Sequence, residues 1–344
     1  MADLRIATLN DPADRRWDDF VAAARDATFC HRAGWKTVVE RGVGHDCHFL
    51  MALDGDMVRG VLPLAHVRSR LFGSALVSTP FCVYGGPLAL DAAAGSALDA
   101  AALDLARRLG VERVEYRLRA ASTRGWAANA ALYATFRKRL AADEQAAFLA
   151  LPRKRRAMIR KAIGQGLSVR PEPDVDRFYR LYATSVRDLG SPVFPKALFH
   201  ELRAVFGRDC EVLIVARDGE PLAGVLSFHF RDEVLPYYAG GTAAARATAA
   251  HDLMYWEVMR RGLARGCRVF DFGRSKRGTG AFAYKRIWGF EPTPLHHEHL
   301  MLKGGAIPER NPLNPRYALA VAAWKRLPLP VANTLGPMVS RGLG

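Results

Sequence analysis

The sequence predicts a protein of the α/β class, more narrowly α+β. It consists of two copies of one unit, and each copy has a mixed but mostly antiparallel sheet. The length of 344 residues accommodates two domains of ordinary size. Half of the residues are apolar and 24% are charged, which is typical of a globular protein and excludes a mainly disordered chain. Residues 52–62 match residues 216–226 at a constant offset, with Ala, Asp, Gly, Gly, Val and Leu at equivalent positions. This repeat indicates a duplication.

The elements follow one another in the same order in both copies. The two matching segments each consist of an apolar strand, an Asp-Gly turn and a second apolar strand, the pattern of a β-hairpin. A strand that ends in glycines, a helix and a short strand then follow. In the first copy the strand ends at residues 84–86, the helix spans 97–109 and the short strand lies within 111–118. In the second copy the strand ends at residues 238–241, the helix spans 249–265 and the short strand spans 268–273.

The boundary between the copies is expected near a helical segment at residues 141–161, which Pro152 interrupts. We therefore expect a first domain over residues 1–145, a second over 146–305 and an ordered C-terminal extension over 306–344.

The chain lacks the patterns of secreted, membrane-spanning and metal-binding proteins. Its N-terminus has no apolar signal-peptide core, and no uncharged run is long enough to span a bilayer. The five cysteines stand singly, which disfavours a disulfide framework and a zinc site. Among residues 296–299, His297 and His299 share one strand face while His296 points away. We expect a cytoplasmic protein without a metal ion.

The positive charge is concentrated in two segments. The net charge is +16. Residues 137–170 hold ten Lys and Arg against two acidic residues, and residues 260–286 hold nine against Asp271. Each segment thus carries +8, and the rest of the chain sums to zero. One electropositive surface for a polyanion or phosphorylated substrate would explain this pattern. The alternative is an excess of arginine on solvated faces.

The most distinctive stretch lies in the second copy. Residues 270–280 read Phe-Asp-Phe-Gly-Arg-Ser-Lys-Arg-Gly-Thr-Gly, and residues 282–290 read Phe-Ala-Tyr-Lys-Arg-Ile-Trp-Gly-Phe. This stretch resembles the Fem-type (FemAB) aminoacyltransferases, which are tandem GNAT proteins, and more narrowly their exosortase/PEP-CTERM-associated branch. The resemblance extends over nearly the whole chain, through residues 29–35, 71–74, 80–87, 151–156, 311–315 and 324–329.

This resemblance implies tandem duplicated GNAT-like domains, an expectation that the order of hairpin, central strand and helix supports. It also implies an amide-forming enzyme. Fem-type enzymes move an aminoacyl group from aminoacyl-tRNA to an amine of a cell-wall precursor. Here the acceptor would be an amine of a peptidoglycan, other cell-envelope or exopolysaccharide precursor. The sequence has no Gly-x-Ser-x-Gly elbow, so we expect direct transfer in a ternary complex with no tightly bound cofactor.

Two other functions stay open at this point. One is a CoA-dependent N-acyltransferase of an amino-sugar precursor. A CoA-dependent GNAT protein carries glycines ahead of its central helix, where backbone amides hold the pyrophosphate, whereas residues 246–251 and 87–92 contain none. The other is a catalytically inactive GNAT-like protein that binds a polyanion through the same basic segments.

Three residues are candidates for catalysis. The resemblance puts Lys285 near the donor phosphate or the reacting carbonyl, where a fixed cation would stabilise negative charge. Its alternative role is that of an exposed helix lysine. Asp271 ends a strand and would orient or deprotonate the acceptor amine, or else cap the loop or pair with Arg274. Tyr238 would bind or protonate a substrate.

The remaining candidates would bind the donor. A glycine-rich loop with cations before a helix is a plausible phosphate cradle, and a basic helix would contact phosphates of a tRNA or sugar nucleotide. The alternatives are an ordinary loop and a solvated helix face. These binding candidates are Arg274, Lys276, Gly278, Gly280 and Tyr284, followed by Arg156, Arg160 and Lys161.

The expected partners are a tRNA or another phosphorylated donor and an envelope precursor, but not DNA. The C-terminal tail contains Trp324, Leu327 and Leu329. These side chains would pack on the body of the protein, or alternatively contact the inner face of the membrane.

Overall fold

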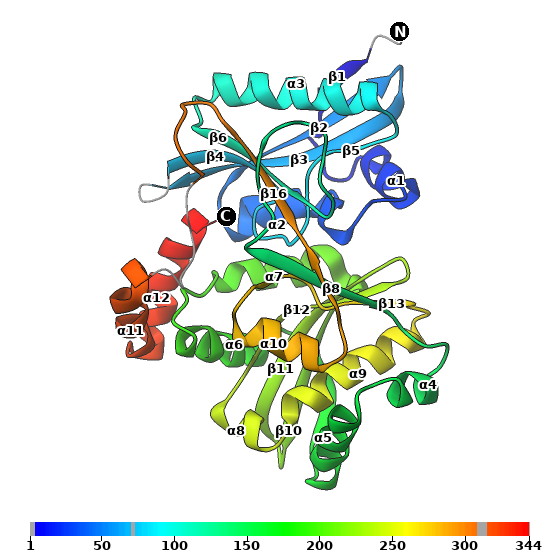
Figure 1. Ribbon diagram of the computed structural model, residues 1–344, viewed down its shortest axis with the longest axis vertical. Coiled ribbons are helices and arrows are strands. Elements are labelled where there is room, and N and C mark those ends of the chain that lie inside the picture. Colours follow the sequence, from blue (N-terminus) through cyan, green and yellow to red (C-terminus); the bar gives the residue numbers. More distant parts are fainter. Residues whose placement is uncertain (1–3, 70–72, 308–314, 344) are drawn as a thin grey trace. The chain divides into compact units, whose positions relative to one another are not determined.

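The computed structural model describes residues 4–69, 73–307 and 315–343 and divides the chain into two compact units (Figure 1). Unit 1 comprises residues 1–131, 294–311 and 338–344, and unit 2 comprises residues 132–293 and 312–337. Parts of two resembling segments, residues 71–72 and 311–314, lie outside the described residues.

The expected domain boundaries lie after residues 145 and 305, whereas the chain enters unit 2 after residue 131 and returns to unit 1 at residue 294. The reason is the pairing of two strands. β8 (Tyr133–Arg139) pairs with β13 (Val269–Asp271) in the sheet of unit 2. β16 (His296–Met301) pairs with β6 (Arg113–Leu118) in the sheet of unit 1.

Unit 1 is a mixed sheet in the order β1-β2-β3-β4-β6-β16-β7, with β5 paired to β3. Among the strand pairs within its described residues, only β4 and β6 run parallel. The remaining strands are β1 (Arg5–Thr8), β2 (Asp46–Asp54), β3 (Met57–Ser69), β4 (Gly73–Ser78), β5 (Leu88–Ala89) and β7 (Ala127–Asn129). The helices of this unit are α1 (Arg15–Ala23), α2 (Gly34–Gly42) and α3 (Ala92–Arg108).

Unit 2 repeats this plan in the order β14-β8-β13-β12-β11-β10-β9, with β15 paired to β8. In this sheet β12 and β13 run parallel. Its other strands are β9 (Ser168–Glu172), β10 (Cys210–Arg217), β11 (Glu220–Phe230), β12 (Glu233–Gly241), β14 (Ser275–Lys276) and β15 (Pro292–Pro294). The predicted fold class is confirmed in both units.

The helices of unit 2 follow β8 in the sequence. They are α4 (Glu144–Leu149), α5 (Arg153–Gly164), α6 (Asp176–Asp188), α7 (Lys196–Phe206), α8 (Ala243–Ala247), α9 (Ala250–Ala264), α10 (Gly280–Ile287), α11 (Ala318–Lys325) and α12 (Leu329–Ser340), of which α12 ends in unit 1. No helix in the described part of the chain is long and apolar enough to cross a membrane.

The predicted hairpins are confirmed. The turns of β2–β3 and β10–β11 contain Gly55 and Gly219, both with positive φ, and each hairpin carries a register shift at the equivalent place. The interruption at Pro152 is also confirmed, because α4 ends at Leu149 and α5 begins at Arg153. The prediction that a strand of the first copy ends in glycines at residues 84–86 is wrong. β4 ends at Ser78, and residues 84–86 lie in the following loop.

The sheet of unit 2 is covered by α6 on one face and α9 on the other. Gly240 of β12 lets α6 approach closely, because a Cβ atom there would lie 2.5 Å from Cα of Tyr182. Gly262 of α9 faces Val234 of β12 with a similarly short approach. A core of aromatic and aliphatic side chains, including Phe136, Phe270 and Trp288, fills the α9 face.

We expect Gly240→Ala to destabilise the protein by about 1–3 kcal/mol, because the added methyl group meets helix backbone that has no freedom to move aside. Urea unfolding measures the loss. Gly164→Ala is the matched control, since a Cβ atom there meets nothing within 4 Å and alanine favours the helix. Equal stability of the two variants would contradict the close packing of α6 on β12.

Candidate active site

Within unit 2, the parallel strands β12 and β13 part after a short ladder. The ladder consists of Glu233 opposite Val269 and Val234 opposite Phe270, whereas β12 continues to Gly241. A register shift in the β11–β12 pairing, between Leu226 and Ser227, accompanies this departure. In the fold that the sequence resembles, the acyl donor inserts where the sheet opens in this way.

In unit 1 the chain itself fills the corresponding place beyond β4 and β6. The amide of Gly85 donates to the carbonyl oxygen of Arg117 at 2.8 Å. The amide of Arg117 in turn donates to Oγ of Ser78 at 3.1 Å. A Cβ atom at Gly85 would lie 2.7 Å from the carbonyl oxygen of Ser78, so this loop is packed tightly. We therefore locate the candidate site in unit 2.

The histidines of β16 belong to a buried polar cluster of unit 1. Nδ1 of His297 and Nδ1 of His299 each lie 4.0 Å from a carboxylate oxygen of Glu115, so the two rings share one strand face as expected. Arg117 donates to the same carboxylate at 3.0 Å. Across residues 4–69, 73–307 and 315–343, no group of three or more His, Cys, Asp or Glu side chains is placed to hold a metal ion.

Lys285 extends from α10 to the loop that follows β13. Its Nζ donates to the carbonyl oxygens of Gly273 and Arg274, at 3.0 and 3.1 Å. The same atom lies 5.6 Å from the ring centroid of Phe136 and 5.5 Å from that of Phe272. An ammonium group has three N–H donors. The site therefore fixes a cation, and two of its donors bond to backbone.

The groups around Lys285 have opposing effects on its pKa. Burial lowers the pKa of Lys285 to about 7, the Asp271 carboxylate acts in the opposite direction, and the Arg274 guanidinium adds to the lowering. The lysine is therefore poised between its charged and neutral forms near neutral pH, a property typical of functional sites.

Asp271 is a fully buried carboxylate at the end of β13. Its Oδ1 accepts a hydrogen bond from the amide of Gly273 at 2.8 Å, so it caps the loop. Its Oδ2 lies 3.2 Å from Nε of Arg137, which also pairs with Glu233. Asp271 therefore forms an ion pair with Arg137 of β8, a partner that the sequence did not indicate.

Two cations of the predicted phosphate cradle pack on one aromatic ring. Cζ of Arg274 lies 4.6 Å and Nζ of Lys276 lies 5.6 Å from the ring centroid of Tyr133. Burial lowers the pKa of Lys276 to about 8, and the charge of Arg274 adds to this effect. The loop therefore gathers positive charge beside β8.

This loop leads directly into a capped helix. Gly278 has a φ of +77°, and Gly280 begins α10 with open space around its α-carbon. Oγ1 of Thr279 accepts from the amide of Phe282 at 3.3 Å. The cations and the helix N-terminus together have the chemistry of an anion site.

Tyr284 lies in packed surroundings. Its ring centroid is 6.0 Å from that of Tyr255 and 6.2 Å from that of Trp288. Burial raises the pKa of the Tyr284 hydroxyl, and the nearby charge of Asp252 adds to this. Asp252 forms a buried ion pair with Arg155 of α5 at 2.6 Å. Tyr284 thus contributes chiefly to the packing between α10 and α9.

The basic residues of α5 begin beside the end of α10, because a Cβ atom at Gly289 would lie 3.5 Å from Cγ of Pro152. Arg156 is half-buried. Arg160 is exposed and packs its guanidinium 5.2 Å from the ring centroid of Phe148. Lys161 donates to the carbonyl oxygen of Ala247 at 3.2 Å.

Tyr238 lies apart from this group. It is buried among the rings of Tyr182, Phe194, Phe199 and Tyr237, with centroid distances of 5.0 to 6.0 Å. Tyr182 belongs to α6 and Phe199 to α7, whereas Lys285 packs on the core of the α9 face. The structure therefore does not bring Tyr238 together with Lys285.

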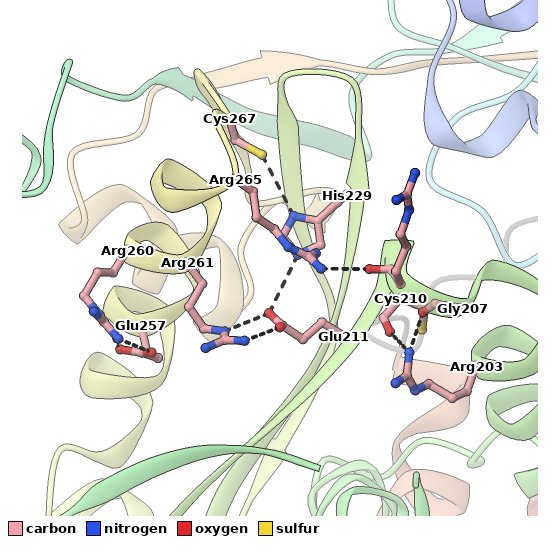
Figure 2. A network of polar contacts seen from close by, with 11 residues as sticks. Arg203, Gly207, Cys210, Glu211, His229, Glu257, Arg260, Arg261, Arg265 and Cys267 are labelled. Atoms are coloured by element: carbon pink, nitrogen blue, oxygen red, sulfur yellow. Dashed lines mark hydrogen bonds and ion pairs between the residues drawn. The ribbon is translucent and has the colours of Figure 1, made fainter. Parts of the chain in front are cut away.

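Part of the positive charge in unit 2 is neutralised internally, as Figure 2 shows. Arg261 binds the Glu211 carboxylate with two nitrogens, at 2.5 and 3.1 Å, and Arg260 binds Glu257 at 2.8 Å. Burial would raise the pKa of Glu211, but the hydrogen bonds from His229 and Arg261 outweigh it and lower the pKa to about 2. Arg260 and Arg261 therefore add little net charge to a basic surface.

Sequence reasoning missed three residues of this site, Tyr133, Arg137 and Arg155. Tyr133 and Arg137 share one face of β8, a relation that strand alternation makes visible. They were missed because β8 precedes the expected domain boundary and was therefore attributed to the first domain.

Comparisons with known proteins identify the domain that holds this site. Residues 153–286 match the acetyltransferase (GNAT) domain family. Unit 2 therefore contains a GNAT-like domain. The GNAT domain confirms the predicted enzyme class, an acyltransferase. A search of curated protein sequences finds no significant match.

Solved structures with a similar fold cover both units. The structure of FemX covers 86% of this chain and 97% of its own, with 12% identity and a TM-score of 0.67. The C-terminal domain of a putative lysylphosphatidylglycerol synthetase from Agrobacterium fabrum covers 90% and 93%, with 14% identity and a TM-score of 0.58. A tandem GNAT protein from the clavulanic acid biosynthesis pathway covers 88% and 100%, with 15% identity and a TM-score of 0.57. These similarities confirm the tandem GNAT-like fold.

Proposed function

We propose that the protein is a Fem-like N-acyltransferase that moves an aminoacyl group from aminoacyl-tRNA to an amine of a cell-envelope or exopolysaccharide precursor. The observation that carries this proposal is the enclosed ammonium group of Lys285, held at the end of β13 where β12 and β13 part. The fold similarity to FemX supports the Fem-like relationship. Membership of the exosortase/PEP-CTERM-associated branch is part of the proposal.

The chemistry needs one charge to be stabilised. The acceptor amine attacks the ester carbonyl carbon, a C–N bond forms, and the C–O bond to the terminal ribose of the tRNA breaks. The proton that the amine loses goes to the leaving ribose hydroxyl. Lys285 stabilises the negative charge that develops on the carbonyl oxygen. The buried Asp271 holds the loop whose carbonyls bind that lysine, through its bond to Gly273.

The segment ahead of α9 favours tRNA over CoA as the donor. Residues 243–247 form a helix of their own, α8, in place of a glycine-rich loop. The amides of Thr248 and Ala249 bond to the carbonyl oxygens of Ala244 and Arg246, so they are engaged within the segment. Backbone donors that bond internally are less available to a pyrophosphate.

Binding of charged tRNA tests the donor. We expect the protein to protect the aminoacylated ends of a mixed charged-tRNA pool, and acetyl-CoA not to compete. The triple variant Arg156→Ala/Arg160→Ala/Lys161→Ala should bind more weakly, with a log–log salt dependence less steep by about three units. Arg260→Ala is the matched control, because Glu257 already neutralises that arginine.

Other outcomes select the alternatives. Saturable binding of acetyl-CoA without protection of tRNA would support the CoA-dependent enzyme. Protection of tRNA with no transfer to any amine of an envelope precursor would support an inactive polyanion-binding protein.

A further inference from the structure

The C-terminal helix α12 turns its small residues to the protein and its large apolar residues to solvent. Ala332 and Gly336 are buried, and a Cβ atom at Gly336 would lie 2.8 Å from the backbone nitrogen of Val193. The exposed fractions of Val331, Leu335 and Met338 are 40%, 42% and 73%. These three residues are spaced by four and three positions, so they form one stripe along the helix. A helix that only packs on the body would show the opposite arrangement.

The preceding helix α11 has the same character. It buries none of its residues, and Leu319 is 86% exposed. Val321 is its docking residue, since a Cβ atom at Gly190 would lie 2.5 Å from Cγ1 of Val321. Leu319 and Val321 are two positions apart and therefore point in nearly opposite directions.

Both helices are held on one support. α11 docks at Gly190 and α12 at Val193, and Arg187 donates to the carbonyl oxygen of Leu327 between them at 3.1 Å. The tail residues named from the sequence, Trp324, Leu327 and Leu329, are half-buried, in keeping with packing. The exposed apolar residues are others, so packing on the body accounts for only part of the tail.

The charged residues of the C-terminal segment itself are all basic. Residues 315–343 contain four basic residues, Arg316, Lys325, Arg326 and Arg341, and no Asp or Glu. Lys325 and Arg326 are exposed where α11 ends. Apolar side chains flanked by cations are the composition of a segment that lies on an anionic bilayer.

From these observations we infer that α11 and α12 dock the protein onto a bilayer of anionic phospholipid. Leu319, Val331, Leu335 and Met338 enter the boundary between headgroups and acyl chains, and Lys325 and Arg326 contact the headgroup phosphates. Four apolar side chains on two short helices are far fewer than the 20 to 30 residues on each side that a stable protein interface uses. A bilayer requires no matching surface, so this small patch suffices for reversible binding.

Vesicle flotation of the full chain tests this inference. We expect the protein to float with vesicles of phosphatidylcholine that contain about one third phosphatidylglycerol, and to bind pure phosphatidylcholine at least about tenfold less. Leu319→Gln/Leu335→Gln/Met338→Gln should reduce flotation at least about tenfold. The control, Met57→Gln/Leu90→Gln/Leu149→Gln, removes three exposed apolar side chains elsewhere, with exposed fractions of 51%, 57% and 55%, and should float like the unmodified protein.

The inference is overturned if the unmodified protein stays with the soluble fraction, or if the tail variant and the control float equally. Sedimentation gives a second readout: a dimer that the tail variant dissociates would assign this patch to a second copy of the chain instead. No donor or acceptor takes part in these measurements, so their outcome is independent of the proposed transferase activity.

Discussion

Lys285→Ala is expected to lower kcat by about 10²–10³-fold while leaving the affinity for the donor nearly unchanged. The ammonium group is fixed by the carbonyl oxygens of Gly273 and Arg274 before any substrate arrives. Its contribution to a developing oxyanion is therefore made without reorganisation, and it is lost in full with the side chain. Single-turnover kinetics with saturating donor separates this loss from weaker binding.

The pH dependence of the reaction gives the same residue a second signature. Burial lowers the pKa of Lys285 to about 7, although Asp271 opposes that shift. Since the charged form stabilises the transition state, kcat should fall as pH rises through about 7. A lysine acting as a general base would give a rise over the same range. In Lys285→Arg the fall should disappear, because a guanidinium does not lose its proton at these pH values.

Arg286→Ala is the matched control for the alanine variant. Arg286 is the next residue of α10, carries the same charge and is exposed. Its removal should change kcat by less than a factor of about three. Equal activity of Lys285→Ala and the unmodified protein would contradict the assignment of the active site to the surroundings of Lys285.

Much of the fold follows from short-range signals in the sequence. Asp54-Gly55 and Asp218-Gly219 each fix a tight turn between apolar strands, and Pro152 ends one helix and starts the next. Such features depend on backbone conformations that a few neighbouring residues determine, and the duplication made each copy a check on the other.

The partners of β8 and β16 had no such signal. Which sheet a strand joins depends on contacts with residues far along the chain, and nothing within Tyr133–Arg139 distinguishes the end of the first copy from the edge of the second sheet. The same cause hid the partner of Asp271. A carboxylate at a strand end predicts a cation nearby, but not that this cation is Arg137.

The buried role of Arg155 did leave a trace in the sequence. It precedes Ile159 by four positions and Ala162 by seven, so it lies on the apolar stripe of α5, and both of those residues are buried. A charge on an apolar stripe predicts a buried ion pair.

Arg155→Ala is expected to lower the free energy of unfolding by about 3 kcal/mol, the largest effect on stability that we predict. The substitution leaves the buried Asp252 carboxylate without the guanidinium that binds it at 2.6 Å. Urea unfolding of Arg155→Ala should show the loss. Arg153→Ala, which removes an exposed charge from the same helix, should change stability by less than about 0.5 kcal/mol.

The loss should depend on pH in a defined direction. Burial raises the pKa of Asp252 even with Arg155 in place, and removing Arg155 raises it further. An acid whose pKa is higher in the folded state favours folding when protonated, and this contribution disappears as pH rises through the folded-state pKa. The deficit of Arg155→Ala should therefore shrink as pH falls from about 7 towards about 4.

Neutralising the partner should recover stability. In Arg155→Ala/Asp252→Asn no buried charge is left unpaired, so part of the loss should return, and Arg155→Met/Asp252→Leu should approach the unmodified protein. The Asp252 carboxylate interacts electrostatically with Tyr284, which precedes Lys285 in α10. These variants therefore also test whether the ion pair positions Lys285. If it does, Arg155→Ala lowers kcat and the apolar pair restores it. An unchanged kcat in a destabilised protein would limit the ion pair to a structural role.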